Sequence, residues 1–137
     1  MDTRTLTYRT STAITAFVLL SGGVTYLLGA EWAVAGVTAL GYPAYLVTIL
    51  GVWKVLGAVA VTVPGFPRLK EWAYAGVAFD LSGAAVSHLV PASPAFHVVV
   101  PTILLAVAAL SWATRPTSRR LVSPTAELRR APETVAA

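Results

Sequence analysis

The chain contains no cysteine among its 137 residues. Disulfides, thiolate nucleophiles, cysteine-ligated zinc, iron–sulfur clusters and dithiol redox chemistry are therefore excluded for this chain alone. Charge is also scarce, because only 12 % of the residues are charged whereas 56 % are hydrophobic. A typical soluble domain carries about twice that share of charged residues. The composition argues against an ordinary soluble enzyme and against disorder over most of the chain.

Four apolar stretches are each long enough to cross a bilayer as a helix, which takes roughly 17–25 residues. They cover approximately residues 11–28, 43–63, 69–90 and 96–114. Because lipid offers the backbone no hydrogen-bond partners, helices are the expected structure. We predict an all-α, four-transmembrane-helix bundle over residues 1–114, with a short outer helix or loop between the first two helices. Residues 115–137 are expected to form a mobile, basic cytoplasmic tail.

Basic residues flank the predicted spans on one side. They are Arg4, Arg9, Arg68, Lys70, Arg115, Arg119, Arg120, Arg129 and Arg130, which is nine of the ten basic residues. An even number of spans places both termini and the middle turn on one side, and the positive-inside rule makes that side cytoplasmic. The net charge of +4 therefore indicates topology and predicts the lipid bilayer, not nucleic acid, as the partner.

Lys54 and Asp80 are the charges that this topology does not explain, since each lies in the middle of a predicted span. The two spans form a hairpin, and each residue is ten positions from its end of the turn. At 1.5 Å per residue both lie about 15 Å deep, near the midplane. We predict an ion pair, or a pair that shares a proton. It either locks the helix register or forms a functional site, because intramembrane ionisable residues are commonly functional.

Other polar residues fall near the predicted site. His88 flanks the face of Asp80 about 12 Å further out, and its imidazole suits proton exchange near neutral pH. Glu31 and Tyr42 are candidates for an outer polar rim, whereas His97 is expected to face lipid headgroups. No spacing of these residues supports a metal site. Small residues beside the charged pair predict close helix packing; the candidates are Gly51, Gly57, Gly76 and Gly83.

Several short runs carry a family resemblance. They are Gly41-Tyr42-Pro43, Gly51-Val52-Trp53-Lys54, Val63-Pro64, Leu69 to Gly76, Phe79 to Ala84, and Ser87-His88. The chain resembles the DoxX-like membrane proteins across roughly residues 12–114, most densely over 41–88. The resemblance implies a four-helix integral membrane protein of the bacterial plasma membrane, with Lys54, Glu71, Asp80 and His88 at characteristic polar positions. It also implies links to oxidoreductase systems, such as a thiosulfate:quinone oxidoreductase subunit or a membrane-bound partner of oxidative-stress enzymes.

Three functions of different classes follow. In the first, which we favour, the protein is an accessory or anchoring subunit for a membrane-associated oxidoreductase system and docks a protein partner through its cytoplasmic arginines. In the second, a small molecule or quinone binds or reacts at Lys54 and Asp80. In the third, a homo-oligomer forms a transporter or proton path. The residues indicate no particular reaction, so the sequence alone leaves open whether the protein is an enzyme.

Overall fold

The computed structural model describes residues 2–91 and 93–121. Within them the chain forms five α-helices and a short 3-10 turn, with no strand. The elements are α1 (Thr3–Leu27), α2 (Glu31–Ala39), α3 (Tyr45–Thr62), α4 (Pro67–Leu89), α5 (Phe96–Thr114) and η1 (Thr117–Arg119). The all-α prediction is confirmed, and the connection between the first two long helices contains the helix α2.

The predicted boundaries are close except at the start of α1, which begins at Thr3 instead of near residue 11. The hydroxyls of Thr7, Ser11 and Thr15 donate to carbonyls four residues earlier, at 2.7–2.9 Å. Such bonds satisfy polar side chains within the helix itself. A polar beginning therefore does not end this helix, although the apolar stretch starts later.

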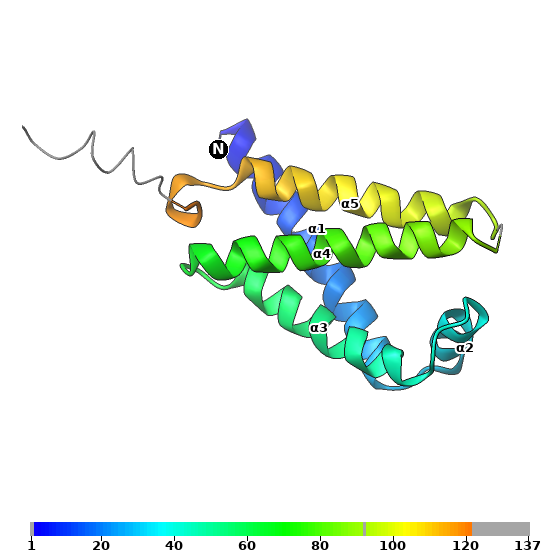
Figure 1. Cartoon of the computed structure of the whole chain (residues 1–137). Coiled ribbons are helices and arrows are strands. Elements are labelled where there is room, and N and C mark those ends of the chain that lie inside the picture. Colours follow the sequence, from blue (N-terminus) through cyan, green and yellow to red (C-terminus); the bar gives the residue numbers. More distant parts are fainter. Residues whose placement is uncertain (1, 92, 122–137) are drawn as a thin grey trace, which may run out of the picture.

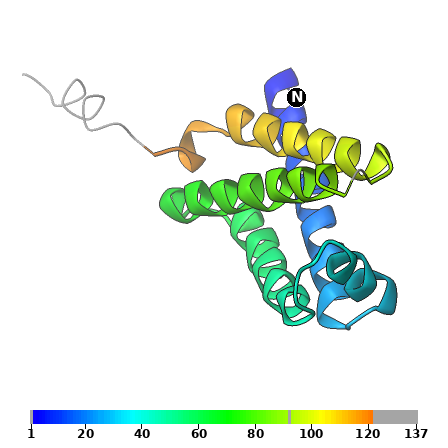
Figure 2. The same ribbon diagram turned by 45° about the vertical axis from the view of Figure 1, so that its right-hand side comes forward.

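The long helices form two pairs, as Figures 1 and 2 show. α1 packs along α3 and α4 packs along α5, while α1 also crosses α5. α3 and α4 are close at their connecting turn and diverge away from it, toward α2. The start of α1, the α3–α4 turn and the end of α5 lie at one end of the bundle, where Arg119 contacts both Tyr8 and Thr62. The divergence of α3 and α4 creates the space in which the candidate site lies.

α1, α3 and α5 are long and apolar enough to cross a membrane. α4 has 23 residues and is therefore long enough, but it is less apolar than the other three long helices and is not among the candidate spans. Its charged residues are Arg68, Lys70, Glu71 and Asp80. Length and composition thus support three of the four predicted spans. Whether α4 spans the membrane depends on how its charges are satisfied.

Glycines bring α1 and α3 into close contact. A Cβ atom on Gly23 would lie 2.8 Å from Val55 Cγ2 and 3.0 Å from the Gly51 carbonyl oxygen, and one on Gly51 would lie 3.0–3.1 Å from Leu27. A Cβ atom on Gly57 would make an ordinary contact, 3.6 Å from Leu19. The sequence predicted Gly51 and Gly57 as packing positions but missed Gly23, which has the tightest surroundings of the three.

Gly76 and Gly83 correct the packing prediction for α4. A Cβ atom added at either position meets nothing within 4 Å among the described residues. Both residues are exposed, because no neighbouring helix approaches α4 closely at these positions. Spacing along one helix identifies a face, but it does not show whether a neighbour covers that face.

Replacing Gly23 with alanine should therefore destabilise the bundle by about 1–3 kcal/mol, the usual cost of overpacking a tight contact. The added methyl group has to push α3 backbone away, since the Val55 amide nitrogen lies 3.0 Å from its position. Thermal unfolding in detergent micelles measures the change. Gly76→Ala is the matched control and should lose no stability, because its methyl group enters open space and alanine favours helix. Equal effects of both substitutions would contradict this account.

Candidate functional site

Lys54 of α3 and Asp80 of α4 form an ion pair between the two diverging helices. Their side chains are 17 % and 19 % exposed, so most of each is removed from solvent. The Lys54 ammonium also lies 5.7 Å from the ring centroid of Tyr26 on α1, within range of a cation–π contact. The sequence predicted that Lys54 and Asp80 lie at the same depth in the hairpin, and in the structure their side chains are in direct contact.

A cleft of about 580 Å³ reaches this pair. Its walls come from α2 and α3 on one side and from α4 on the other, with Tyr26 of α1 beside Lys54. Most of the lining is apolar or aromatic, and includes Trp32, Leu46, Leu50 and Phe79. The ion pair therefore places a concentrated polar group against largely hydrophobic walls.

The outer part of the cleft holds further polar side chains. The hydroxyls of Tyr42 and Ser87 are 2.8 Å apart. His88 and His97 stack with ring centroids 4.7 Å apart and an interplanar angle of 15°, and His88 Nδ1 lies 3.2 Å from the Ser93 hydroxyl. Tyr42, Ser87 and both histidines line the cleft.

Two sequence predictions about this region need correction. Glu31 is exposed at the start of α2 and is not among the residues that line the cleft. His97, expected to face headgroups, stacks on His88, and its Nδ1 atom is buried without a hydrogen-bond partner in the described part of the chain. Spacing could not show either result, because the position of α2 and the approach of α5 to the end of α4 are tertiary features.

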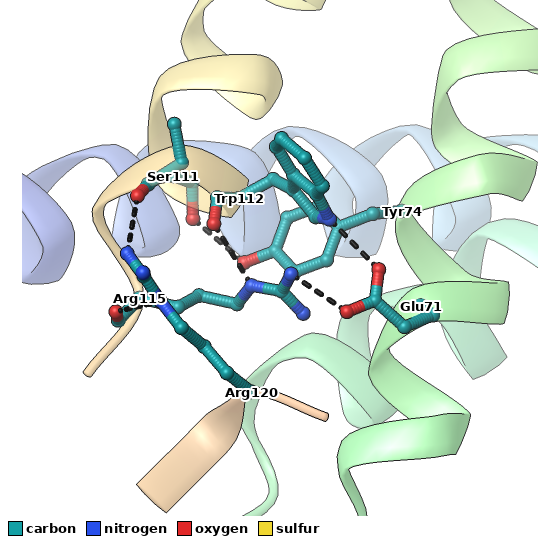
Figure 3. Close-up of polar contacts among 7 residues, drawn as sticks. Glu71, Tyr74, Ser111, Trp112, Arg115 and Arg120 are labelled. Atoms are coloured by element: carbon teal, nitrogen blue, oxygen red, sulfur yellow. Dashed lines mark hydrogen bonds and ion pairs between the residues drawn. The ribbon is translucent and has the colours of Figure 1, made fainter. Parts of the chain in front are cut away.

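A second polar cluster lies at the other end of the bundle (Figure 3). The Glu71 carboxylate accepts hydrogen bonds from Trp112 Nε1 and Arg115 Nη2, both at 2.8 Å. Arg115 is only 3 % exposed, and its guanidinium lies 5.3 Å from the ring centroids of both Tyr74 and Trp112. Glu71 therefore joins α4 to the end of α5.

Three hydroxyls continue this cluster into the bundle. Ser111 lies 2.6 Å from the Thr12 hydroxyl and 2.7 Å from the Tyr74 hydroxyl, oxygen to oxygen. Together they link α1, α4 and α5, and all three residues are buried. Because every hydroxyl has a partner, this network is best explained as packing between helices.

Lys70 is fully buried, with no exposed surface. Its ammonium donates to the carbonyl oxygens of Ala60, Val61 and Val63 at the end of α3. The last carbonyls of a helix have no partner within the helix, so Lys70 caps α3 from the first turn of α4. The sequence predicted Lys70 only as a basic residue that flanks a span. The position of Lys70 just after a tight turn is the sequence feature that could have indicated this cap.

The start of the basic tail contacts the helices. Arg119 donates to the Tyr8 hydroxyl at 2.8 Å, and Arg120 donates to the carbonyls of Arg115 and Ala113. The tail was expected to be mobile from Arg115 onward, but residues 115–120 are held by these bonds. The remainder of that prediction concerns residues 122–137, which lie outside the described residues.

A comparison with family models decides the classification, because the DoxX-like family model matches residues 10–111. The chain belongs to the DoxX-like family. No curated protein and no solved structure matches the chain. In this DoxX-like protein the matched residues include Lys54, Asp80 and the whole lining of the cleft. Arg115 and the residues after it lie outside the match.

Proposed function

We propose that this DoxX-like protein binds an apolar molecule with a hydrogen-bond-accepting head, within a membrane-spanning helical bundle. The observation that carries the proposal is the cleft that reaches the Lys54–Asp80 pair. Its volume of about 580 Å³ is within the range of ligand pockets, which are mostly apolar with a few convergent polar groups.

Lys54 is the residue proposed to hold the head group. Its ammonium has three N–H donors, and the bond to Asp80 uses one of them. The others can donate to a carbonyl or carboxylate oxygen of a bound head group. A quinone fits this donor set and would supply two-electron redox chemistry when bound; a fatty acid presents the same kind of head. The proposal is one of binding and assigns no reaction.

The proposal places the protein in the bacterial plasma membrane with four spans and cytoplasmic termini. The contacts of α4 support its role as a span despite its charges. Asp80 pairs with Lys54, Glu71 pairs with Arg115, and Lys70 is bonded to three carbonyls. Paired charges and charges near a helix end are those a membrane tolerates best. Arg68, near the first residue of α4, is exposed beside the turn.

The accessory-subunit hypothesis uses the cytoplasmic arginines of the tail and of the α3–α4 turn as a docking surface. Among the described residues, Arg115, Arg119 and Arg120 bond to side chains and carbonyls of their own chain. Arg68 at the turn is exposed, and the last two arginines of the tail lie outside the described residues. We place the binding site first because a cleft reaches the Lys54–Asp80 pair.

Lys54→Met should abolish retention of the bound molecule. The methionine preserves length and apolar volume but removes every N–H donor at the end of the cleft. Native mass spectrometry of protein purified in mild detergent measures the retained species, and its mass distinguishes a quinone from a fatty acid or phospholipid. Arg68→Met is the matched control, since Arg68 is exposed and does not line the cleft. A Lys54→Met protein that retains the same molecule, or a wild-type protein that retains none, would contradict the proposal.

A further inference from the structure

The walls of the cleft belong to two parts of the molecule that are separate near its outer end. No Cα atom of α2 lies within 8 Å of a Cα atom of α4, although residues of both helices line the cleft. Within the cleft, two side-chain bonds between described residues link α4 to the side formed by α2 and α3. They are Lys54–Asp80 and Tyr42–Ser87.

These two bonds lie at different heights. Ser87 follows Asp80 by seven residues on α4, which places it about 10 Å further along the helix axis. The ion pair lies at the inner end, and the two hydroxyls lie nearer the outer end of α4. The Tyr42–Ser87 pair therefore lies between the ion pair and the outer end of α4.

Tyr42 is attached firmly to α2. Gly41 has a φ of +87°, which glycine adopts readily. The Gly41 amide donates to the Thr38 carbonyl at 2.9 Å, and the Tyr42 amide donates to the Val37 carbonyl at 3.4 Å. This is the Schellman arrangement that ends a helix. These bonds join Tyr42 to the end of α2, and its bond to Ser87 connects that end of α2 to α4.

The direction of the Tyr42–Ser87 hydrogen bond follows from where the single hydrogen of the Ser87 hydroxyl goes. The Ser87 hydroxyl donates its one hydrogen to the Gly83 carbonyl at 2.7 Å. Its oxygen therefore accepts, and the Tyr42 hydroxyl donates. Tyr42 is 42 % exposed, so water can take over the bond when the two side chains separate. A bond of this kind is strong enough to bias the position of a wall and weak enough to break readily.

We propose that Tyr42 and Ser87 form a clasp that closes the mouth of the cleft, and that the bound molecule enters and leaves between α2 and α4 when the clasp opens. The role of the clasp in controlling entry rests on the proposed binding function. The clasp itself is a property of the protein without any ligand.

The test measures access to the cleft in the ligand-free protein. The chain has no cysteine, so a single introduced thiol reports its own position. Ala84→Cys places the thiol on the cleft lining, one helical turn beyond Asp80, at a position that is only partly exposed. The rate of modification by N-ethylmaleimide is followed by mass spectrometry, with the protein in phosphatidylcholine nanodiscs. Gly76→Cys is the control, because it is exposed and lies outside the cleft lining.

Adding Tyr42→Phe should raise the modification rate of Ala84→Cys by about two- to tenfold, the change that one ordinary net hydrogen bond produces in an opening equilibrium. Ser87→Ala should act in the same direction, and Gly76→Cys should react at an unchanged rate. An unchanged rate for Ala84→Cys, or an equal rise at both positions, would overturn the clasp. Failure to retain any molecule would overturn the proposed function instead, so the two failures are distinguishable.

Discussion

Replacing Asp80 with asparagine is expected to destabilise the protein by about 3 kcal/mol or more, the usual result of removing one partner from a buried ion pair. The Lys54 side chain is only 17 % exposed, so its ammonium would lose its counter-charge in a poorly solvated position. Equilibrium unfolding in mixed micelles, followed by circular dichroism, measures the difference from wild type. A loss below about 0.5 kcal/mol, as for an exposed pair, would contradict the buried placement.

The double variant Lys54→Met/Asp80→Leu separates a structural lock from a binding site. Replacing both charges with apolar groups removes the desolvation cost together with the attraction, so stability should return to within about 1 kcal/mol of wild type or exceed it. The same variant should not retain the bound molecule, since the donors at the end of the cleft are gone. A stable double variant that still retains it would show that the pair does not hold the bound molecule.

Lys70→Met is expected to cost about 4 kcal/mol and to lower the melting temperature strongly. Lys70 is fully buried and donates to three carbonyl oxygens at the end of α3. A hydrogen bond to a charged group contributes roughly 1.5–3 kcal/mol, and each buried carbonyl left unpaired adds its desolvation cost. The loss should weaken the α3–α4 turn first, which hydrogen exchange of the amides around Val63 can detect.

Arg68→Met supplies the control for this prediction. It also removes one positive charge, but Arg68 lies two residues before Lys70 at an exposed position. It should change stability by no more than about 0.5 kcal/mol, as for most surface substitutions. If the two variants unfolded alike, Lys70 would be acting through its charge and not through its bonds to the carbonyls.

Hydrophobic runs and charge positions were sufficient to predict most of the helical layout. Span length is a local property, so the four long helices could be placed within a few residues at most boundaries. The Lys54–Asp80 contact was also predictable, because a tight turn forces antiparallel neighbours to share depth. The family resemblance, confirmed over residues 10–111, rested on the same region of the chain.

Lateral packing was not predictable in the same way. Gly23 allows α1 to contact α3 closely, whereas Gly76 and Gly83 on α4 meet open space. All three are small residues in apolar helices, and nothing in their local sequence distinguishes them. The burial of Lys70 and Arg115 was missed for the same reason, since their partners lie on other helices or turns.

By itself, the sequence determined that this is a helical membrane protein, and it predicted one charged pair at the level of the bilayer centre. Hydropathy and helix rise are sufficient for that result, because both depend only on neighbours along the chain. Only the tertiary structure decided that α3 and α4 diverge and that a cleft leads to the pair. Those features depend on which face each helix turns toward its neighbours, and contacts between residues far apart in the sequence determine this.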